Sequence, residues 1–131
     1  MKWYGTSASV TQIGHVNKHR QLIAWQCCHD LAREVYVLTR MFPADERYGL
    51  SQQLRRAAVS TAANIAEGSA RYGRAEFAHA LSIALGSLAE VDSLLAIASD
   101  LGYVGDEERE RVEALRDRAS RATYGLQRRM R

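Results

Sequence analysis

Apolar residues recur at alternating steps of three and four in four segments of the chain. This spacing places them on one face of an α-helix. The segments cover about residues 20–42, a stretch ending near residue 68, about 74–101, and a stretch beginning at 106. Each is therefore predicted to be an amphipathic helix. The four stripes are Ala24, Cys28, Leu31, Val35, Leu38 and Phe42; Leu54, Ala58, Thr61 and Ile65; Phe77, Leu81, Ala84, Leu88, Val91, Leu95 and Ala98; and Val112, Leu115, Ala119, Ala122 and Leu126.

Helix-ending residues mark the boundaries between these segments. Pro43 ends the first helix, because the residue before a proline is pushed out of the α region, and Ser51 is the predicted N-cap of the second. Gly68 suits a left-handed C-terminal cap, Gly102 closes the third helix, and Asp106 is the predicted N-cap of the fourth. Short connections between four such helices predict an all-α, antiparallel, up-down-up-down four-helix bundle over residues 19–131. Residues 1–18 are polar and aperiodic, which predicts a flexible N-terminal arm.

The charge of the chain adds a bias toward arginine. The chain has 131 residues and a formal net charge of +3 at pH 7. Of its 18 cationic residues, only Lys2 and Lys18 are lysines. Arginine forms forked hydrogen bonds to carboxylates and phosphates, so the bias fits nucleic-acid binding, ion pairs at an interface, or the composition of a GC-rich genome. A net charge this small gives weak long-range attraction.

The two cysteines, Cys27 and Cys28, are adjacent within the first predicted helix. A disulfide between neighbours is strained, and Cys28 is predicted to be a small core residue. No apolar run approaches the length of a membrane span, and the first 16 residues lack the apolar segment of a signal peptide. We therefore expect a cytoplasmic protein with no membrane partner.

Motifs for catalysis or cofactor binding are not found in the sequence. It has no glycine-rich phosphate loop, no paired CxxC and no HExxH. His15 and His19 have the four-residue spacing that can chelate a metal on a helix, but neither has a carboxylate or cysteine at useful spacing. We expect no metal and no cofactor.

One enzyme-like pattern runs from Arg74 to His79. It matches the Arg-x4-His form of HEPN-type ribonucleases, which are also helical bundles, and in which the His acts as acid or base while the Arg stabilises phosphate charge. In a chain with sixteen Arg and four His, a match of this kind is expected by chance. The alternative interpretation places Arg74 in the first turn of the third helix and His79 on its flank. A ribonuclease remains the alternative function.

A narrow polar stripe follows the second predicted helix, away from its apolar face. It consists of Gln53, Arg56, Ser60, Asn64 and Glu67, with Ser87 and Glu90 forming a comparable pair on the third helix. The stripe is either a solvated face or, because its short polar residues lie among alanines, a helix–helix or subunit interface. The second interpretation predicts that Arg56 pairs with a carboxylate such as Glu67 or Glu90.

Basic residues gather late in the chain and around the connection between the second and third helices. From Arg116 to Arg131 there are six Arg and one acid. They either compensate a helix dipole or form a phosphate-contacting rim. The candidate nucleic-acid contacts are Arg55, Arg71, Arg74, Arg116, Arg121, Arg128 and Arg129. A monomer with this charge would bind nucleic acid weakly, whereas a symmetric ring repeats the patch and binds through multivalency.

The run PADERYGLSQQLRRAAVSTAANIAEG, from Pro43 to Gly68, resembles the bacterial four-helix bundle proteins encoded by intervening sequences in 23S rRNA genes. The resemblance covers about residues 22–104, and its NIAEG core is specific. It continues through Glu76-Phe77 and the run IALGSLAE, and ends at LGYV. The chain departs from the family pattern at Thr61-Ala62-Ala63 and in its milder charge.

This resemblance implies a bundle that assembles as a ring-like homopentamer. Ring-shaped relatives serve as accessory proteins of diversity-generating retroelements, where they contact a reverse transcriptase and nucleic acid through basic outer surfaces. We therefore predict a non-enzymatic oligomeric scaffold that binds RNA or DNA through Arg-rich surfaces. The alternatives are the ribonuclease using Arg74 and His79, and a protein-only adaptor whose arginines serve subunit contacts.

Overall fold

The computed structural model describes residues 18–71 and 73–130, which form four α-helices and no β-strand. A 3-10 turn, η1 (Lys18–Gln21), precedes α2 (Ile23–Thr39), and a second, η2 (Ala44–Glu46), precedes α3 (Leu50–Ala70). The long helix α4 (Arg74–Asp100) and the last helix α5 (Asp106–Arg129) complete the fold. The predicted all-α class is confirmed. The predicted arm lies outside the described residues except for Lys18, which belongs to η1.

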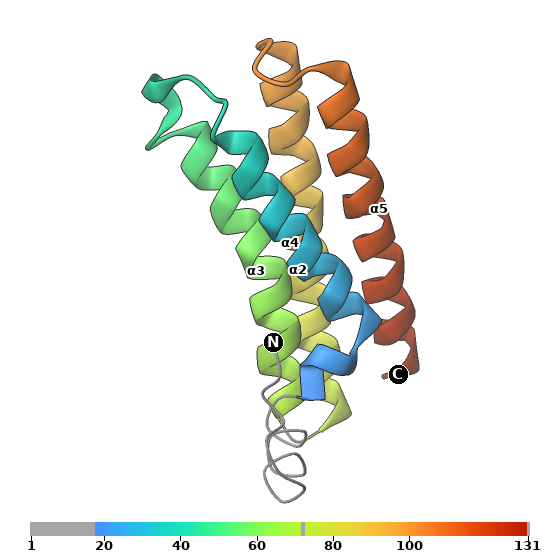
Figure 1. Cartoon of the computed structure of the whole chain (residues 1–131). Helices are drawn as coiled ribbons and strands as arrows, with labels where there is room; N and C mark the ends of the chain where they lie inside the picture. The colour runs from blue at the N-terminus through green and yellow to red at the C-terminus, as the bar shows by residue number, and fades with distance from the viewer. Residues whose placement is uncertain (1–17, 72, 131) are drawn as a thin grey trace, which may run out of the picture.

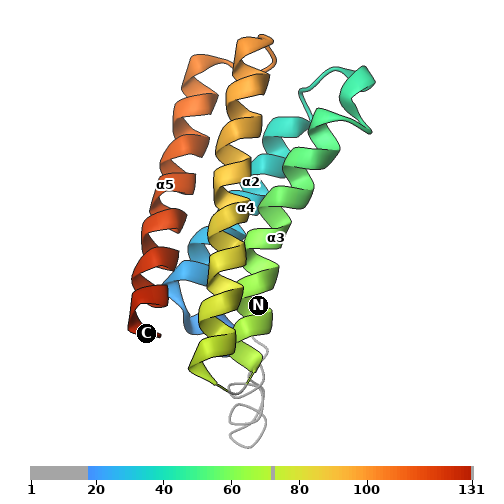
Figure 2. The ribbon, with the colours of Figure 1, turned by 180° about the vertical axis from the view of Figure 1, so that it is seen from behind.

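The four helices lie side by side, and each packs against two others (Figures 1 and 2). Helix α2 contacts α3 and α5, and α4 contacts the same two helices. The predicted apolar stripes meet between them: Leu31, Leu54, Leu81, Leu88 and Val112 are fully buried. Phe77, Leu115 and Ala122 are half-buried at the edge of the same core. Each stripe therefore faces the others, as its spacing predicts.

Contacts between the connections define two ends of the bundle. At one end, the rings of Phe42 and Tyr103 lie 5.6 Å apart, and the Tyr103 hydroxyl donates to Glu46 at 2.9 Å. At the other end, the Arg74 guanidinium donates to the backbone carbonyl of Arg129. The α2–α3 and α4–α5 connections thus share one end, while α4 begins where α5 ends (Figure 1).

One predicted helix end and one predicted N-cap are wrong. Helix α2 ends at Thr39 rather than next to Pro43, and the Thr39 hydroxyl donates to the Val35 carbonyl at 2.8 Å. Helix α3 begins at Leu50 after Gly49, so Ser51 is a buried first-turn residue rather than the N-cap. The Leu50 amide instead donates to the Glu46 side chain at 3.0 Å.

Gly68 and Asp106 also have roles other than those predicted. Gly68 is buried inside α3, and the left-handed glycine is Gly73, at φ 114°. A Cβ on Gly68 would lie 2.6 Å from the Ala80 Cβ, so this glycine permits close packing of α3 on α4. Gly105 is the N-cap of α5, and Asp106 is its first residue. Gly102 has φ 79° directly after α4, as its predicted closing role requires.

The expectation that no apolar run approaches the length of a membrane span needs correction for α4. This helix is long and apolar enough to span a membrane by length and composition alone. The same test is passed by helices that cross the centre of a soluble bundle. In α4 the fully buried residues Leu81, Ala84, Leu88, Val91 and Leu95 pack in the core formed with the other three helices.

Candidate functional site

Five of the seven arginines predicted to contact nucleic acid lie at one end of the bundle. We define this basic end as Arg71, Arg74, Arg121, Arg128 and Arg129. Arg74 opens α4 and reaches the carbonyl of Arg129 near the end of α5. Arg121 and Arg129 line a hollow of about 400 Å³ with residues 21–24, at the start of α2. Helix termini from three parts of the chain therefore bring these guanidinium groups together.

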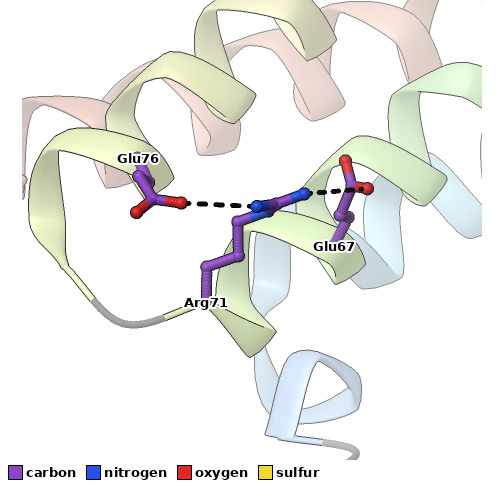
Figure 3. A network of polar contacts seen from close by, with 3 residues as sticks. All are labelled: Glu67, Arg71 and Glu76. Carbon is purple, nitrogen blue, oxygen red and sulfur yellow. Dashed lines mark hydrogen bonds and ion pairs between the residues drawn. The ribbon is translucent and has the colours of Figure 1, made fainter.

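Arg71 is held between two carboxylates at the connection from α3 to α4. Its guanidinium lies 3.4 Å from Glu67, one turn earlier in α3, and 3.4 Å from Glu76 in the first turn of α4 (Figure 3). All three side chains are more than half exposed. Arg71 therefore bridges two helices, and its charge is already balanced within the chain.

The other two predicted contacts, Arg55 and Arg116, lie away from the basic end. Arg55 donates to the Thr39 hydroxyl at 2.7 Å and covers the Tyr36 ring at 4.8 Å, which places it beside the end of α2. Arg71 follows Arg55 by 16 residues, at the end of α3, and a helix of this length spans about 24 Å. Arg116 is largely buried, at 3.7 Å from Asp92 of α4. These two arginines join helices rather than extend the basic end.

The opposite end of the bundle is acidic. Its carboxylates come from η2, the end of α4 and the first turns of α5: Asp45, Glu46, Asp100, Asp106, Glu107, Glu108 and Glu110. We define these residues as the acidic end. Acids at the start of α5 and arginines at its end both suit the dipole of that helix. Acids therefore outnumber arginines at this end, which also has Arg47 and Arg109, and arginines outnumber acids at the basic end.

Arg74 and His79 do not form a joint site. Five residues along an α-helix correspond to a rotation of about 140°. Arg74 faces α5, where it meets Arg129, whereas His79 lines a hollow on the α3 side with Asn64 and Glu67. The two side chains that the ribonuclease interpretation requires thus point to different sides of α4.

The predicted polar stripe lies along the seam between α3 and α4. Ser60 and Ser87 share a hydrogen bond of 3.0 Å across it, and the Asn64 amide donates to both oxygens of Ser60, at 2.8 and 2.9 Å. Gln53 and Arg56 line a hollow of about 330 Å³ beside this contact. A helix–helix contact is therefore observed at the centre of the stripe, with solvent-exposed ends.

The predicted pairing of Arg56 with Glu67 is not formed. Glu67 pairs with Arg71, one turn away, because the i,i+4 spacing brings them together on α3. Glu90 lines the same hollow as Arg56, but within the described ranges the two form no ion pair. Arg56 and Glu90 are thus exposed charges at the rim of the seam.

An apolar groove between α2 and α3 was not predicted from the sequence. It encloses about 600 Å³, and we refer to it as the α2–α3 groove. Its lining residues are Trp25, His29, Ala32, Arg33, Glu34, Tyr36, Val37, Arg40, Val59, Ala62, Ala63 and Ala66. The signal was present in Val37 and Val59, which are apolar residues outside the buried stripes of their helices.

Aromatic rings gather where the α2–α3 groove approaches η1. The rings of Trp25 and His29 stack with centroids 4.7 Å apart, and the rings of His19 and Trp25 meet edge-on with centroids 5.1 Å apart. Burial against these groups and the neighbouring Arg20 lower the pKa of His19. His19 is thus a packed residue, and its predicted chelation partner His15 lies outside the described residues. No cluster of three metal-ligating side chains occurs within residues 18–71 and 73–130.

Cys28 has the core position that was predicted. It is fully buried, its Sγ lies 3.9 Å from the Thr123 hydroxyl of α5, and burial raises the pKa of its thiol. The half-buried Cys27 also has a raised pKa, mainly through burial. Both cysteines are free thiols. A raised pKa keeps a thiol protonated and unreactive at neutral pH.

These features define a class of protein: a four-helix bundle with charged ends, a polar seam and an apolar groove. Residues 20–125 match the family model of the 23S rRNA-intervening sequence protein, and the chain belongs to this family. No curated protein sequence matches it significantly. A solved structure from Bacteroides thetaiotaomicron, described as a protein with unknown function from the S23 ribosomal protein family, is similar with a TM-score of 0.74. The two chains are 21% identical, and the match covers 79% of this chain and 97% of the other.

Proposed function

We propose that this protein is a non-enzymatic oligomeric scaffold that binds RNA or DNA through its basic end. Each chain forms an up-down-up-down bundle, and five copies assemble into a ring-like homopentamer in the cytoplasm. The α2–α3 and α4–α5 connections lie at the same end of the bundle, which supports the up-down-up-down topology. The chain belongs to the 23S rRNA-intervening sequence family. Because resemblance to this family implies a ring-like homopentamer, membership supports the proposed assembly.

The observation that carries the proposal is the gathering of arginines from the α3–α4 connection, α4 and α5 at the basic end. Arg128 and Arg129 are exposed, and neither forms an ion pair within the described ranges. Guanidinium groups bind phosphate through paired N–H donors. Each phosphate that they neutralise releases bound counterions, which makes binding weaken as salt increases.

Assembly would make this modest patch effective. One copy offers a few arginines and a net charge of +3, which gives weak binding. A ring with parallel copies presents every basic end on one rim. A single nucleic acid can then contact several copies at once, and its affinity rises without any new kind of contact.

Fluorescence anisotropy with a labelled single-stranded RNA, measured between 50 and 200 mM salt, tests the binding. We expect the affinity to fall steeply with salt. In the double variant Arg128→Ala/Arg129→Ala, the slope of log K against log[salt] should decrease by about 1.4, because each contact with a single strand contributes about 0.7. The control Arg47→Ala/Arg109→Ala removes equal charge at the opposite end and should leave the slope unchanged.

Two results would contradict the proposal. Absence of RNA and DNA binding at 50 mM salt would exclude the nucleic-acid role and favour the protein-only adaptor, to which the exposed α2–α3 groove is also suited. Light scattering that gives the 14.7 kDa mass of one chain would exclude the assembly. Cleavage of RNA that disappears in His79→Ala would instead support the ribonuclease.

A further inference from the structure

The α2–α3 groove leaves apolar side chains in contact with water. Val37 and Val59 are 45% and 43% exposed, and Tyr36 is 42% exposed. Ala62, Ala63 and Ala66 line the groove from the α3 side. Exposed apolar side chains that lie together in this way indicate an interaction surface. The small alanine side chains leave space for an incoming helix.

A second surface with exposed apolar residues lies on α4, beside its seam with α3. Ile83, Gly86, Glu90, Ser93 and Ile97 follow steps of three, four, three and four, so they form one stripe, which we call the α4 ridge. All five residues are exposed, and the two isoleucines are 43% and 45% exposed. The ridge is about 21 Å long, and the groove is about 18 Å long from Trp25 to Val37.

Gly86 leaves the backbone of α4 accessible at the ridge. A Cβ on Gly86 would have no atom within 4 Å, whereas a Cβ on Gly68 would collide with Ala80. A glycine inside a helix weakens the helix relative to alanine. No packing within the described chain accounts for Gly86. A glycine on an exposed helix face allows the backbone of another helix to approach closely.

The charges beside the two surfaces are complementary. After Arg74, helix α4 itself has no Lys or Arg, and its exposed acids include Glu90 and Asp100. The cation beside them is Arg56 of α3, which lines a hollow with Glu90 but forms no ion pair with it within the described ranges. The groove is bordered by Arg33 and Arg40, which are exposed and form no ion pair within the described ranges. The one carboxylate of the groove, Glu34, pairs with Arg111 of α5.

We propose that the α4 ridge of one copy docks in the α2–α3 groove of a second copy. The isoleucines then cover Val37 and Val59, while Glu90 and Asp100 meet Arg33 and Arg40. This inference rests on the proposed assembly and specifies its interface. Because the groove and the ridge are different surfaces, the contact is heterologous, and each bound pair keeps one groove and one ridge free to add further copies. Such a contact forms a ring where the rotation between copies closes.

Mixing two blocked variants tests this pairing. Val59→Asp places a charge in the groove and Ile97→Asp places one on the ridge; both positions are exposed, so the fold should be retained, as circular dichroism can verify. Each variant alone should remain a monomer of about the 14.7 kDa chain mass in light scattering. Their mixture should form 1:1 heterodimers and nothing larger, because only one intact groove and one intact ridge meet. Tyr48→Asp, at a 77% exposed residue outside both surfaces, should assemble as the wild type does.

Charge reversal gives a second test that does not depend on the apolar residues. Glu90→Arg/Asp100→Arg and Arg33→Glu/Arg40→Glu should each assemble at least tenfold more weakly than the wild type. Mixing them should restore species larger than dimers. The reversed ridge of one variant then meets the reversed groove of the other, and their unchanged groove and ridge also match.

The outcomes separate this inference from the proposed function. A monomeric wild type would overturn both. A wild type that assembles, with single variants that assemble equally well or a mixture without heterodimers, would overturn the groove–ridge pairing and leave the assembly standing. Loss of RNA binding in Val59→Asp without a change in mass would assign the groove to nucleic acid and also overturn the pairing.

Discussion

The two ends of the bundle differ both in charge and in how their connections are held. At the acidic end, a ten-residue connection from 40 to 49 is fixed by Glu46, which accepts hydrogen bonds from the Leu50 amide and the Tyr103 hydroxyl. At the basic end, only residues 71–73 join α3 to α4. There the helices are held by the close approach of Gly68 to Ala80.

This difference shows which groups each end can offer to a partner. The acidic end uses its central carboxylate, Glu46, to cap α3 and join two connections. At the basic end, the close packing of Gly68 and the exposed ion pairs of Arg71 join α3 to α4, while Arg128 and Arg129 have no ion-pair partners in the described ranges. Charge that does not hold the fold together is available for phosphate. Variants at each end can therefore separate stability from binding.

The largest effect on stability is expected from Gly68→Ala. The new Cβ would lie 2.6 Å from the Ala80 Cβ and 3.0 Å from a Phe77 ring carbon, so α3 and α4 must separate. Overpacking of this kind costs about 1–3 kcal/mol. Urea unfolding monitored by circular dichroism, at a fixed protein concentration, measures the loss.

Gly125→Ala is the matched control, because Gly125 lies in α5 and its added Cβ meets no atom within 4 Å. It should stabilise the fold by about 0.5–1 kcal/mol, the usual advantage of alanine over glycine inside a helix. Equal stability changes in the two variants would show that Gly68 has no special role in packing.

Periodicity predicted most of the fold. The stripes of α2 and α3 are buried as predicted, and α4 has the predicted bounds within one residue, because burial of an amphipathic face imposes its spacing on the sequence. Helix ends were less predictable. Ser51 and Asp106 are good N-caps by propensity, but the N-cap residues are Gly49 and Gly105, and the Glu46 side chain accepts the hydrogen bond of the Leu50 amide. Which residue caps a helix depends on where the preceding connection places its side chains.

The candidate site was predicted less completely, because ion pairing depends on distances across helices. Sequence spacing grouped Arg55 with Arg71, although one helix separates them by about 24 Å. It also predicted an ion pair between Arg56 and Glu67, but Glu67 forms its ion pair with Arg71. The α2–α3 groove was missed because it arises from side chains of two helices, and neither helix shows it alone.

A smaller effect is expected at the acidic end from Tyr103→Phe, which removes the hydrogen bond to Glu46. The backbone amide of Leu50 and then the Tyr103 hydroxyl lower the pKa of Glu46 below its ordinary value of 4.5. A lowered carboxylate pKa stabilises the fold above pH 4.5, and this stability is lost as the pH falls through the folded-state pKa. Urea midpoints between pH 3 and 7 should therefore vary less with pH in Tyr103→Phe than in the wild type.

The same hydrogen bond predicts a change at alkaline pH. Donation to Glu46 raises the pKa of Tyr103 above its ordinary value of 10.0. This stability is present below pH 10 and is lost as the pH rises through the folded-state pKa. Glu46→Gln, which keeps an acceptor but no charge, is the control. A wild type and Tyr103→Phe with superimposable pH profiles would contradict the link between η2 and the α4–α5 connection.

The smallest effect is expected from Arg71→Ala at the basic end. Its two ion pairs are exposed, with relative side-chain exposures of 52%, 63% and 58% for Arg71, Glu67 and Glu76. Exposed pairs contribute about 0–1 kcal/mol each and are screened by salt. Urea unfolding at 0.05 M NaCl should therefore show a loss of at most about 1 kcal/mol that shrinks at 0.5 M NaCl, with Arg71→Lys close to the wild type. A loss that equals that of Gly68→Ala and persists at high salt would mean that charge, rather than close packing, holds the basic end together.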